Sequence, residues 1–370
     1  LATWLATWQA VFVFPVLWTA WEFLLGRQGI GGIAYSQMDF PASTQIAALV
    51  GAPGVTFLVS LAASALAVAW HLRNRPSEAL PAVAIPLVLC TATIVWGALV
   101  LARPLAGPVV RVGLAATDET VRFFRTERAE EALPVVAAYA RRVGDLAARG
   151  AEVVVLPEKF VGVTPAYADA VRDALADAAR THRVWVVAGL NRIEGSVRRN
   201  VALVVAPDGR AVLEYGKVHM VPGWEDGYTP GRAPAPIPSQ GTWGVAICRD
   251  LMYPDVARAN ALAGVRLLLV PAWDFVRDGW VTSRIAAMRA VENGLAVARP
   301  AQQGLVVATD EHGRLLAEVA TGDAPEVLLL VDVPLGSGAT PYTRMGDWFG
   351  WLTTALSAGI VVSAVASARG

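Results

Sequence analysis

The sequence predicts an α/β domain inserted between membrane-spanning α-helices. Three observations indicate this. Apolar residues make up 55% of the chain and the mean hydropathy is +0.46, whereas about 45–50% apolar residues is usual for soluble domains. The apolar excess collects in residues 1–102 and again after Trp348, and the part between alternates strand-like and helix-like patterns. We therefore predict a transmembrane region over 1–102, a water-facing α/β domain over 103–340 and a final membrane helix over 341–370.

Four stretches are long and apolar enough to cross a bilayer, which takes about 20 residues of helix. The third holds no charged residue, and a helix in a protein core rarely stays apolar on every face for that length. Three stretches precede the α/β domain and one follows it; they are Trp8–Leu25, Thr44–Trp70, Leu80–Leu101 and Trp348–Ala366. The second contains Gly51, Pro53 and Gly54, so we expect a kink or a re-entrant turn there. Because the chain opens at Leu1 without a methionine, we also expect spans missing upstream.

The basic residues in short loops predict the orientation, because such loops stay in the cytoplasm. The link His71–Arg75 is short and basic. It is therefore predicted to be cytoplasmic, which places the segment from Arg103 to Asp347 on the outer face. Glu22 lies inside the first predicted span, where an ionisable group is costly unless it faces protein or a polar cavity or lies near the end of the span.

Composition argues against several classes of function. The 31 basic and 31 acidic residues cancel, so no charge excess favours a nucleic-acid partner. Cys90 and Cys248 are far apart in sequence, which disfavours a disulfide framework. The four histidines have no spacing typical of a metal site. We therefore predict no metal ion and no cofactor.

The middle segment reads as strands alternating with helices, together with hairpins. Such a pattern predicts two sheets whose outer faces are covered by helices. Polar side chains stand at three strand ends: Glu158 follows an apolar strand, Lys217 follows the second strand of a hairpin, and Cys248 ends a third strand. Taken singly, each residue has an ordinary structural explanation, such as a solvated loop residue or a small buried side chain.

Together, these residues and their surroundings resemble the nitrilase, or carbon–nitrogen hydrolase, superfamily, which has a glutamate, a lysine and a cysteine in this order. The resemblance covers residues 109–335. It rests on Leu156-Pro157-Glu158, Tyr215-Gly216-Lys217, Val245-Ala246-Ile247-Cys248-Arg249-Asp250, Arg289-Ala290-Val291-Glu292-Asn293-Gly294, Gly304 and Asp310-Glu311-His312-Gly313-Arg314. It implies a nitrilase-like αββα two-sheet sandwich with Glu158, Lys217 and Cys248 as catalytic residues and Glu225 as a second functional glutamate.

The membrane segments are similar to those of the apolipoprotein N-acyltransferase family, the membrane branch of that superfamily. The features that carry this resemblance are Pro15, Trp18 and Glu22, the stretch Gly51–Leu58, and Gly346-Asp347-Trp348 before the closing span. It implies a phospholipid acyl donor, a lipoprotein acceptor with a diacylglyceryl-cysteine, and no nucleic acid. It also implies a multi-pass protein of the bacterial inner membrane with its catalytic domain on the periplasmic face.

The sequence departs from the family pattern at several places, among them Pro271–Phe275 and the presence of three spans before the domain where the family typically has several more. Pro222-Gly223-Trp224-Glu225 replaces the usual Pro-Phe-Gly-Glu, Arg249-Asp250 replaces Tyr-Glu, and Gly227–Gly231 is more typical of soluble amidases. Two alternatives therefore stay open: a membrane-anchored amidase or nitrilase acting on a small amide or nitrile, and a catalytically silent scaffold. A polar pocket would favour the amidase, and an apolar groove would count against it.

The residue types predict a thioester mechanism. Glu158 would be the general base that activates Cys248, since the thiolate is the nucleophile. Lys217 and the backbone amide after Cys248 would stabilise the oxyanion, and Glu225 would orient Lys217 or the base. Four aromatic residues are expected either in a lipid-facing rim or in the domain core: Trp224, Trp273, Phe275 and Trp280.

Overall fold

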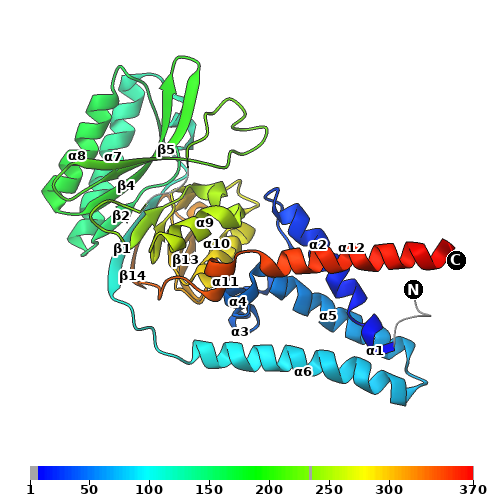
Figure 1. Cartoon of the computed structure of the whole chain (residues 1–370). Coiled ribbons are helices and arrows are strands. Elements are labelled where there is room, and N and C mark those ends of the chain that lie inside the picture. The colour runs from blue at the N-terminus through cyan, green and yellow to red at the C-terminus, as the bar shows by residue number, and fades with distance from the viewer. Residues whose placement is uncertain (1–6, 233–235, 370) are drawn as a thin grey trace. The chain divides into compact units, whose positions relative to one another are not determined.

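The computed structural model describes residues 7–232 and 236–369. The chain forms two compact units (Figure 1). One comprises the residues up to Pro104 together with those from Thr340, and the other comprises Leu105–Ala339.

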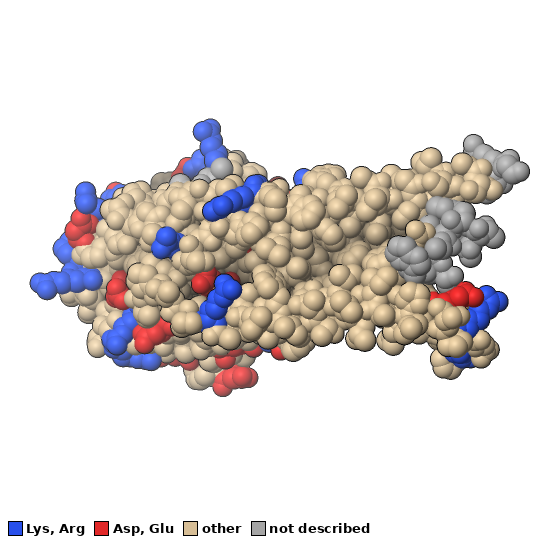
Figure 2. Space-filling view, turned by 60° about the horizontal axis from the view of Figure 1, so that its bottom comes forward, with Lys and Arg blue, Asp and Glu red and all other residues tan. Residues whose placement is uncertain are grey.

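The first unit is helical. Among the described residues, three of its helices are long and apolar enough to cross a membrane. They are α5 (Ala52–His71), α6 (Pro76–Leu101) and α12 (Trp348–Arg369). Large apolar side chains on α6 and α12 are exposed, including Leu87 and Val362, as expected of lipid-facing helices. Figure 2 shows long uncharged stretches along this unit and charged side chains gathered over the α/β unit.

The first predicted span is divided in the structure. It consists of α1 (Thr7–Ala10) and α2 (Val13–Gly26), and α2 has only 14 residues. Pro15 has no N–H to donate to the carbonyl of Val11, so the helical ladder is interrupted there. The second predicted span begins late: α3 (Pro41–Thr44) and α4 (Ala47–Val50) are single turns, and α5 starts after Gly51. Gly51 has φ +74°, and a Cβ there would lie 2.6 Å from the ring of Tyr342.

Glu22 on α2 is held by three parts of this unit. Its carboxylate accepts hydrogen bonds from Trp18 Nε1 at 3.0 Å, from Ile33 N at 3.1 and 3.2 Å, and from Thr56 Oγ1 at 2.9 Å. Ile33 begins the short helix η1 (Ile33–Gln37), and Thr56 lies on α5. Glu22 therefore faces protein partners, which offset the cost of a carboxylate among apolar helices.

The second unit contains two large sheets and a short two-stranded pairing. The larger sheet has the strand order β14-β1-β2-β4-β5-β6, with β3 paired to β4, and the smaller has the order β13-β12-β10-β8-β7. The larger sheet comprises β1 (Val109–Ala116), β2 (Val153–Val155), β3 (Val161–Val163), β4 (Trp185–Glu194), β5 (Val197–Val205), β6 (Ala211–Gly216) and β14 (Val327–Pro334). The smaller comprises β7 (Trp243–Val245), β8 (Leu267–Leu269), β10 (Ala296–Arg299), β12 (Leu305–Thr309) and β13 (Leu315–Ala320).

Helices cover the outer faces of these sheets, as the αββα expectation requires. One apolar core lies between the sheets and includes Leu114, Val245 and Leu269. A second lies between the larger sheet and the helices α7 (Ala129–Ala148) and α8 (Ala168–His182). The helix α10 (Gly279–Asn293) packs on the smaller sheet and on α9 (Pro254–Leu262) (Figure 1). Burial on both faces explains why β2 and β8 are continuous apolar runs.

Several elements differ in detail from the sequence prediction. The strand expected to end at Cys248 stops at Val245, and Cys248 instead begins the short helix η3 (Cys248–Met252). Five strands, not four, follow α10, because β11 (Ala301–Gln302) pairs with β9 (Ala272–Trp273) outside the two sheets. These elements have two to five residues and are too short to show a period in the sequence.

Candidate active site

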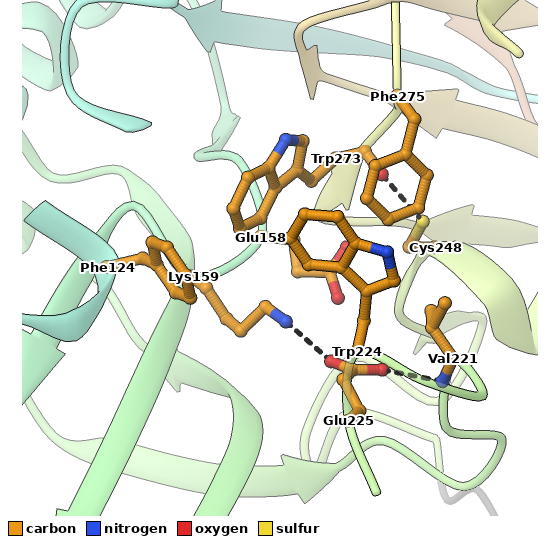
Figure 3. Close-up of a pocket in the computed structure, with 9 residues that line it drawn as sticks. All are labelled: Phe124, Glu158, Lys159, Val221, Trp224, Glu225, Cys248, Trp273 and Phe275. Atoms are coloured by element: carbon orange, nitrogen blue, oxygen red, sulfur yellow. Dashed lines mark hydrogen bonds and ion pairs between the residues drawn. The ribbon is translucent and has the colours of Figure 1, made fainter. Parts of the chain in front are cut away.

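The predicted site residues come together at strand ends of both sheets. Glu158 lies in the turn after β2, Lys217 directly follows β6, and Cys248 lies three residues beyond β7. Glu225 lies in the loop after Lys217. Figure 3 shows the pocket that results, which is lined by Phe124, Glu158, Lys159, Val221, Trp224, Glu225, Cys248, Trp273 and Phe275.

Alternating charges form what we call the ion-pair chain: Glu158, Lys217, Glu225 and Lys159. Lys217 Nζ lies 2.8 Å from Glu158 Oε1 and 2.8 Å from Glu225 Oε2. Lys159 Nζ lies 2.6 Å from Glu225 Oε1. The Asn200 amide joins the two carboxylates, donating to Glu158 Oε1 at 2.5 Å and to Glu225 Oε1 at 2.8 Å. All of these side chains are buried, so each charge depends on its partners.

The charges of the ion-pair chain shift the pKa values of Glu225 and Lys217. Burial alone would raise the pKa of Glu225, but the charges of Lys217 and Lys159 outweigh it and lower that pKa to about 2. Burial would likewise lower the pKa of Lys217, yet the negative charges of Glu158 and Glu225 raise it above its usual value. Glu225 and Lys217 are therefore both ionised at neutral pH.

Cys248 sits at a strained turn. Its φ is +42°, a region that side chains other than glycine rarely adopt. Its thiol donates to the Trp273 carbonyl at 3.2 Å, and its N–H donates to the Pro271 carbonyl at 3.0 Å. Burial raises the pKa of Cys248 to about 12, with the charge of Glu158 acting in the same direction. The resting nucleophile is therefore a neutral thiol, and its reaction requires a base.

Glu158 has an oxygen available for that proton. Its Oε1 accepts from Lys217 and Asn200, whereas its Oε2 accepts no hydrogen bond from the described part of the chain. The backbone around it is fixed: Gln302 Nε2 donates to the Glu158 carbonyl at 2.7 Å, and Glu158 N donates to the Ala272 carbonyl at 3.2 Å. Such a rigid carboxylate with a free lone pair is well suited to general-base chemistry.

Asp250 connects the nucleophile turn to the lysine strand. Its Oδ1 accepts from Val218 N at 3.1 Å and from His219 N at 2.9 Å, directly after Lys217. Its Oδ2 accepts from Ile247 N at 3.0 Å, directly before Cys248, and from Tyr215 Oη at 2.8 Å. One fully buried carboxylate thus fixes the spacing between the two chemical groups.

We expect Asp250→Asn to slow the reaction of Cys248 by about tenfold, because a displacement near 1 Å can cost up to a hundredfold. The amide keeps the size of the side chain, but its NH₂ group faces N–H and O–H donors that need an acceptor. Leaving these buried donors without an acceptor costs about 1–3 kcal/mol of folding free energy. The rate of alkylation of Cys248 and the thermal unfolding midpoint measure these effects. The exposed Asp208→Asn serves as the control; equal behaviour of the two variants would show that Asp250 does not position the site.

A buried ion pair lies next to the nucleophile. Arg299, which ends β10, pairs with Asp274, and both side chains are about 1% exposed or less. The positive charge of Arg299 opposes the upward shift in the pKa of Cys248. Sequence reasoning missed this pair together with Lys159, Asn200, Gln302 and the role of Asp250. Of these residues, only Lys159 and Asp250 could have been found from the sequence. Lys159 directly follows Glu158, and Asp250 lies two residues after Cys248.

Aromatic rings form the mouth of the pocket. Trp224 packs against Phe275 with ring centroids 5.1 Å apart, and Phe124 meets Trp273 edge-on at 4.9 Å. The exposed fractions of Trp224 and Phe275 are 56% and 36%, whereas Trp273 is buried at 9%. The expected aromatic set is therefore split: Trp224, Phe275 and Trp280 are exposed, and Trp273 belongs to the pocket wall.

A cysteine, a glutamate and a lysine at the strand ends of an αββα sandwich define an enzyme of the carbon–nitrogen hydrolase type. Residues 112–340 match the family described as carbon–nitrogen hydrolase. Since that match covers more than half of the 370 residues, the chain belongs to the carbon–nitrogen hydrolase family. Residues 1–65 match the apolipoprotein N-acyltransferase N-terminal domain.

Individual relatives fall into two groups. An apolipoprotein N-acyltransferase of Geobacter metallireducens is 27% identical over 96% of this chain and 74% of its own length. A deaminated glutathione amidase of Synechocystis is 31% identical, over 51% of this chain and 77% of its own length. Only the first group matches the helices as well as the catalytic unit.

Solved structures resemble the catalytic unit. An amidase from Nesterenkonia sp. is 26% identical with a TM-score of 0.51, covering 62% of this chain and 91% of its own. In a variant of that amidase (25% identical, TM-score 0.51, covering 62% of this chain and 92% of its own), the acetamide moiety of fluoroacetamide is attached covalently to the active-site cysteine.

Proposed function

We propose that the protein transfers a fatty acyl chain from a phospholipid, through a thioester on Cys248, to the N-terminal amine of a lipoprotein. The observation that carries the proposal is the combination, in one chain, of membrane-length helices with a thiol pocket that has an aromatic mouth. A small-amide hydrolase needs neither feature. The relatives that match nearly the whole chain support the same assignment.

In the first half-reaction, Cys248 Sγ attacks the ester carbonyl carbon of the donor while its proton moves to Glu158 Oε2. Lys217 and the N–H of Arg249 stabilise the oxyanion that forms. Arg249 lies at the start of η3, and its N–H has no acceptor among the described residues. The ester C–O bond then breaks, the lysophospholipid leaves with the proton from Glu158, and a thioester remains.

In the second half-reaction, the amine of the diacylglyceryl-cysteine attacks the thioester carbon. Glu158 removes a proton from the amine, the C–S bond breaks, and the Cys248 sulfur takes the proton back as the amide is released. Glu225 stays ionised throughout and holds Lys217 in place. We propose no cofactor or metal for either step.

We further propose that the protein lies in the bacterial inner membrane with the catalytic unit on the periplasmic face. The turn between α5 and α6 contains Arg73 and Arg75, both of which are exposed, and basic loops of this kind stay cytoplasmic. To test the orientation, a reactive reporter is attached to this loop or to the catalytic unit, and intact cells are treated with a membrane-impermeant reagent. We expect the reporter on the catalytic unit to be modified. Modification of the reporter on the loop would refute the orientation.

The thioester is the decisive test. The detergent-purified chain is incubated with phospholipid and its intact mass is measured, with Cys248→Ala and Cys90→Ala as the comparison variants. We expect a fatty-acyl mass increase that hydroxylamine removes, present in the Cys90→Ala variant and absent in the Cys248→Ala variant. An unmodified mass together with turnover of small amides would instead establish the membrane-anchored amidase.

A further inference from the structure

Lys159 is the member of the ion-pair chain that the mechanism does not use. Its φ is +47°, so the turn after β2 directs two consecutive side chains, Glu158 and Lys159, toward the same pocket. In an extended strand they would point to opposite faces. A strained backbone conformation costs about 1–3 kcal/mol and persists where the surroundings require it.

The surroundings of Lys159 are aromatic and nearly dry. Its side chain is 8% exposed, and Nζ lies 5.0 Å from the ring centre of Tyr228, 5.4 Å from that of Trp273 and 5.8 Å from that of Phe124. Its ion-pair partner is Glu225 Oε1, at 2.6 Å. An ammonium group in such a site is stabilised by ring faces and by one carboxylate, and it is held away from solvent.

The chain contains two lysines, and both belong to the ion-pair chain; the other 29 of its 31 lysine and arginine residues are arginines. A lysine ammonium is a compact point charge, whereas a guanidinium is a planar fork that needs more room and more acceptors. The presence of lysine at these two positions fits a local requirement for a small cation.

We propose that Lys159 is a positioning residue that keeps Glu225 ionised, so that Glu225 can hold Lys217 at the oxyanion position. Glu225 Oε2 accepts from Lys217 Nζ at 2.8 Å and from Val221 N at 2.9 Å, while Oε1 receives Lys159. Without Lys159, the single charge of Lys217 would have to neutralise both Glu158 and Glu225. This inference rests on the proposed thiol chemistry but not on the identity of the acyl donor or acceptor.

The sign of the pH effect follows from the neighbouring charges. The pKa of Glu225 is lowered to about 2, so its contacts with Lys217 are present at neutral pH and are lost only as pH falls through that value. Loss of a cation at this distance raises a carboxyl pKa by roughly 1–3 units, into the range of about pH 3–5. The charged and titratable groups that face Glu225 and Cys248 are Glu158, Lys159, Lys217, Tyr228, Asp274 and Arg299.

The test is the pH dependence of Cys248 acylation by p-nitrophenyl acetate, whose carbonyl forms an oxyanion when the thiol attacks it, in the detergent-purified full chain on a Cys90→Ala background. At each pH, the rate for a variant is divided by the rate for the parent. We expect the ratio for Lys159→Met to fall roughly three- to tenfold between about pH 7 and about pH 4. For Lys159→Arg, which keeps the charge, the ratio is expected to be constant with pH, even if the absolute rate drops.

The double variant Lys159→Met with Glu225→Gln separates this inference from a purely structural role. It has no carboxyl to protonate at position 225, so the acid-dependent fall should disappear although the rate stays low. A constant ratio for Lys159→Met, or a fall that persists in the double variant, would overturn the proposal.

A second measurement does not depend on whether Lys159→Met folds. The two lysines are labelled competitively with acetic anhydride at about pH 9, and the modified peptides are quantified. We expect Lys159 to react several-fold faster in Glu225→Gln than in the parent, and unchanged labelling would contradict the ion pair. Absence of a phospholipid thioester would refute the proposed acyl donor while leaving both of these results intact.

Discussion

Glu158→Gln should abolish the activation of Cys248 while leaving the fold intact. Glutamine has the shape of glutamate and can still accept from Lys217 and Asn200 through its oxygen. Its NH₂ group would replace Oε2, which accepts no hydrogen bond from the described residues, and cannot take a proton. Since the pKa of Cys248 is raised to about 12, very little thiolate forms without a base. We expect the rate of thioester formation to fall by roughly 10²–10⁴-fold.

The rate of acyl-adduct formation, followed by intact mass, measures this loss. Glu214→Gln is the matched control, because Glu214 lies on β6 and pairs with Arg192 at the surface of the same sheet. Parental rates in Glu158→Gln would mean that another group accepts the thiol proton. A loss of near-identical size in the control would point to a general effect on the fold.

Lys217→Met should have the largest combined effect on stability and activity. It removes the cation that lies 2.8 Å from each of two buried carboxylates. Asn200 Nδ2 donates to both carboxylates, so they lie near each other, and like charges in one dry site raise the pKa of one of the pair. Removing one partner of a buried ion pair costs about 3–5 kcal/mol. Catalysis should fall by at least about 10³-fold, since both the oxyanion cation and an ionised base are lost.

Chemical denaturation and the acylation rate together test this expectation. Arg210→Met, which removes an exposed partner of Asp208, should cost no more than about 1 kcal/mol. The double variant Lys217→Met with Glu225→Gln should regain part of the stability, because one unpaired carboxylate is gone, but none of the activity. If Lys217→Met were as stable as the parent, the two carboxylates would not depend on Lys217 for their charge.

The strand ends that carry Glu158 and Lys217 could be predicted from the sequence, because local patterns of apolar and turn residues mark them. The apolar run before Glu158 and the hairpin before Lys217 place these residues correctly, and the long apolar helices α5, α6 and α12 coincide with predicted spans. The start of α2 and the φ of Cys248 were not predictable. The start of α2 depends on the break in helical hydrogen bonding at Pro15, and the conformation of Cys248 depends on its contacts with a neighbouring segment. Neither feature produces a period in the sequence.

The sequence by itself predicted the class of architecture and the long apolar helices, because hydrophobic periodicity records them. It predicted the four site residues through their resemblance to the carbon–nitrogen hydrolase family, and their catalytic roles stay a prediction. Only the tertiary structure decided how charge is shared in the site. Lys159, Asn200, Asp250 and Arg299 are distant from most of their partners in sequence, and they meet only because strands of two sheets end at one pocket. Electrostatic interactions between buried groups depend on distance in space and on exclusion of water, and a linear sequence displays neither.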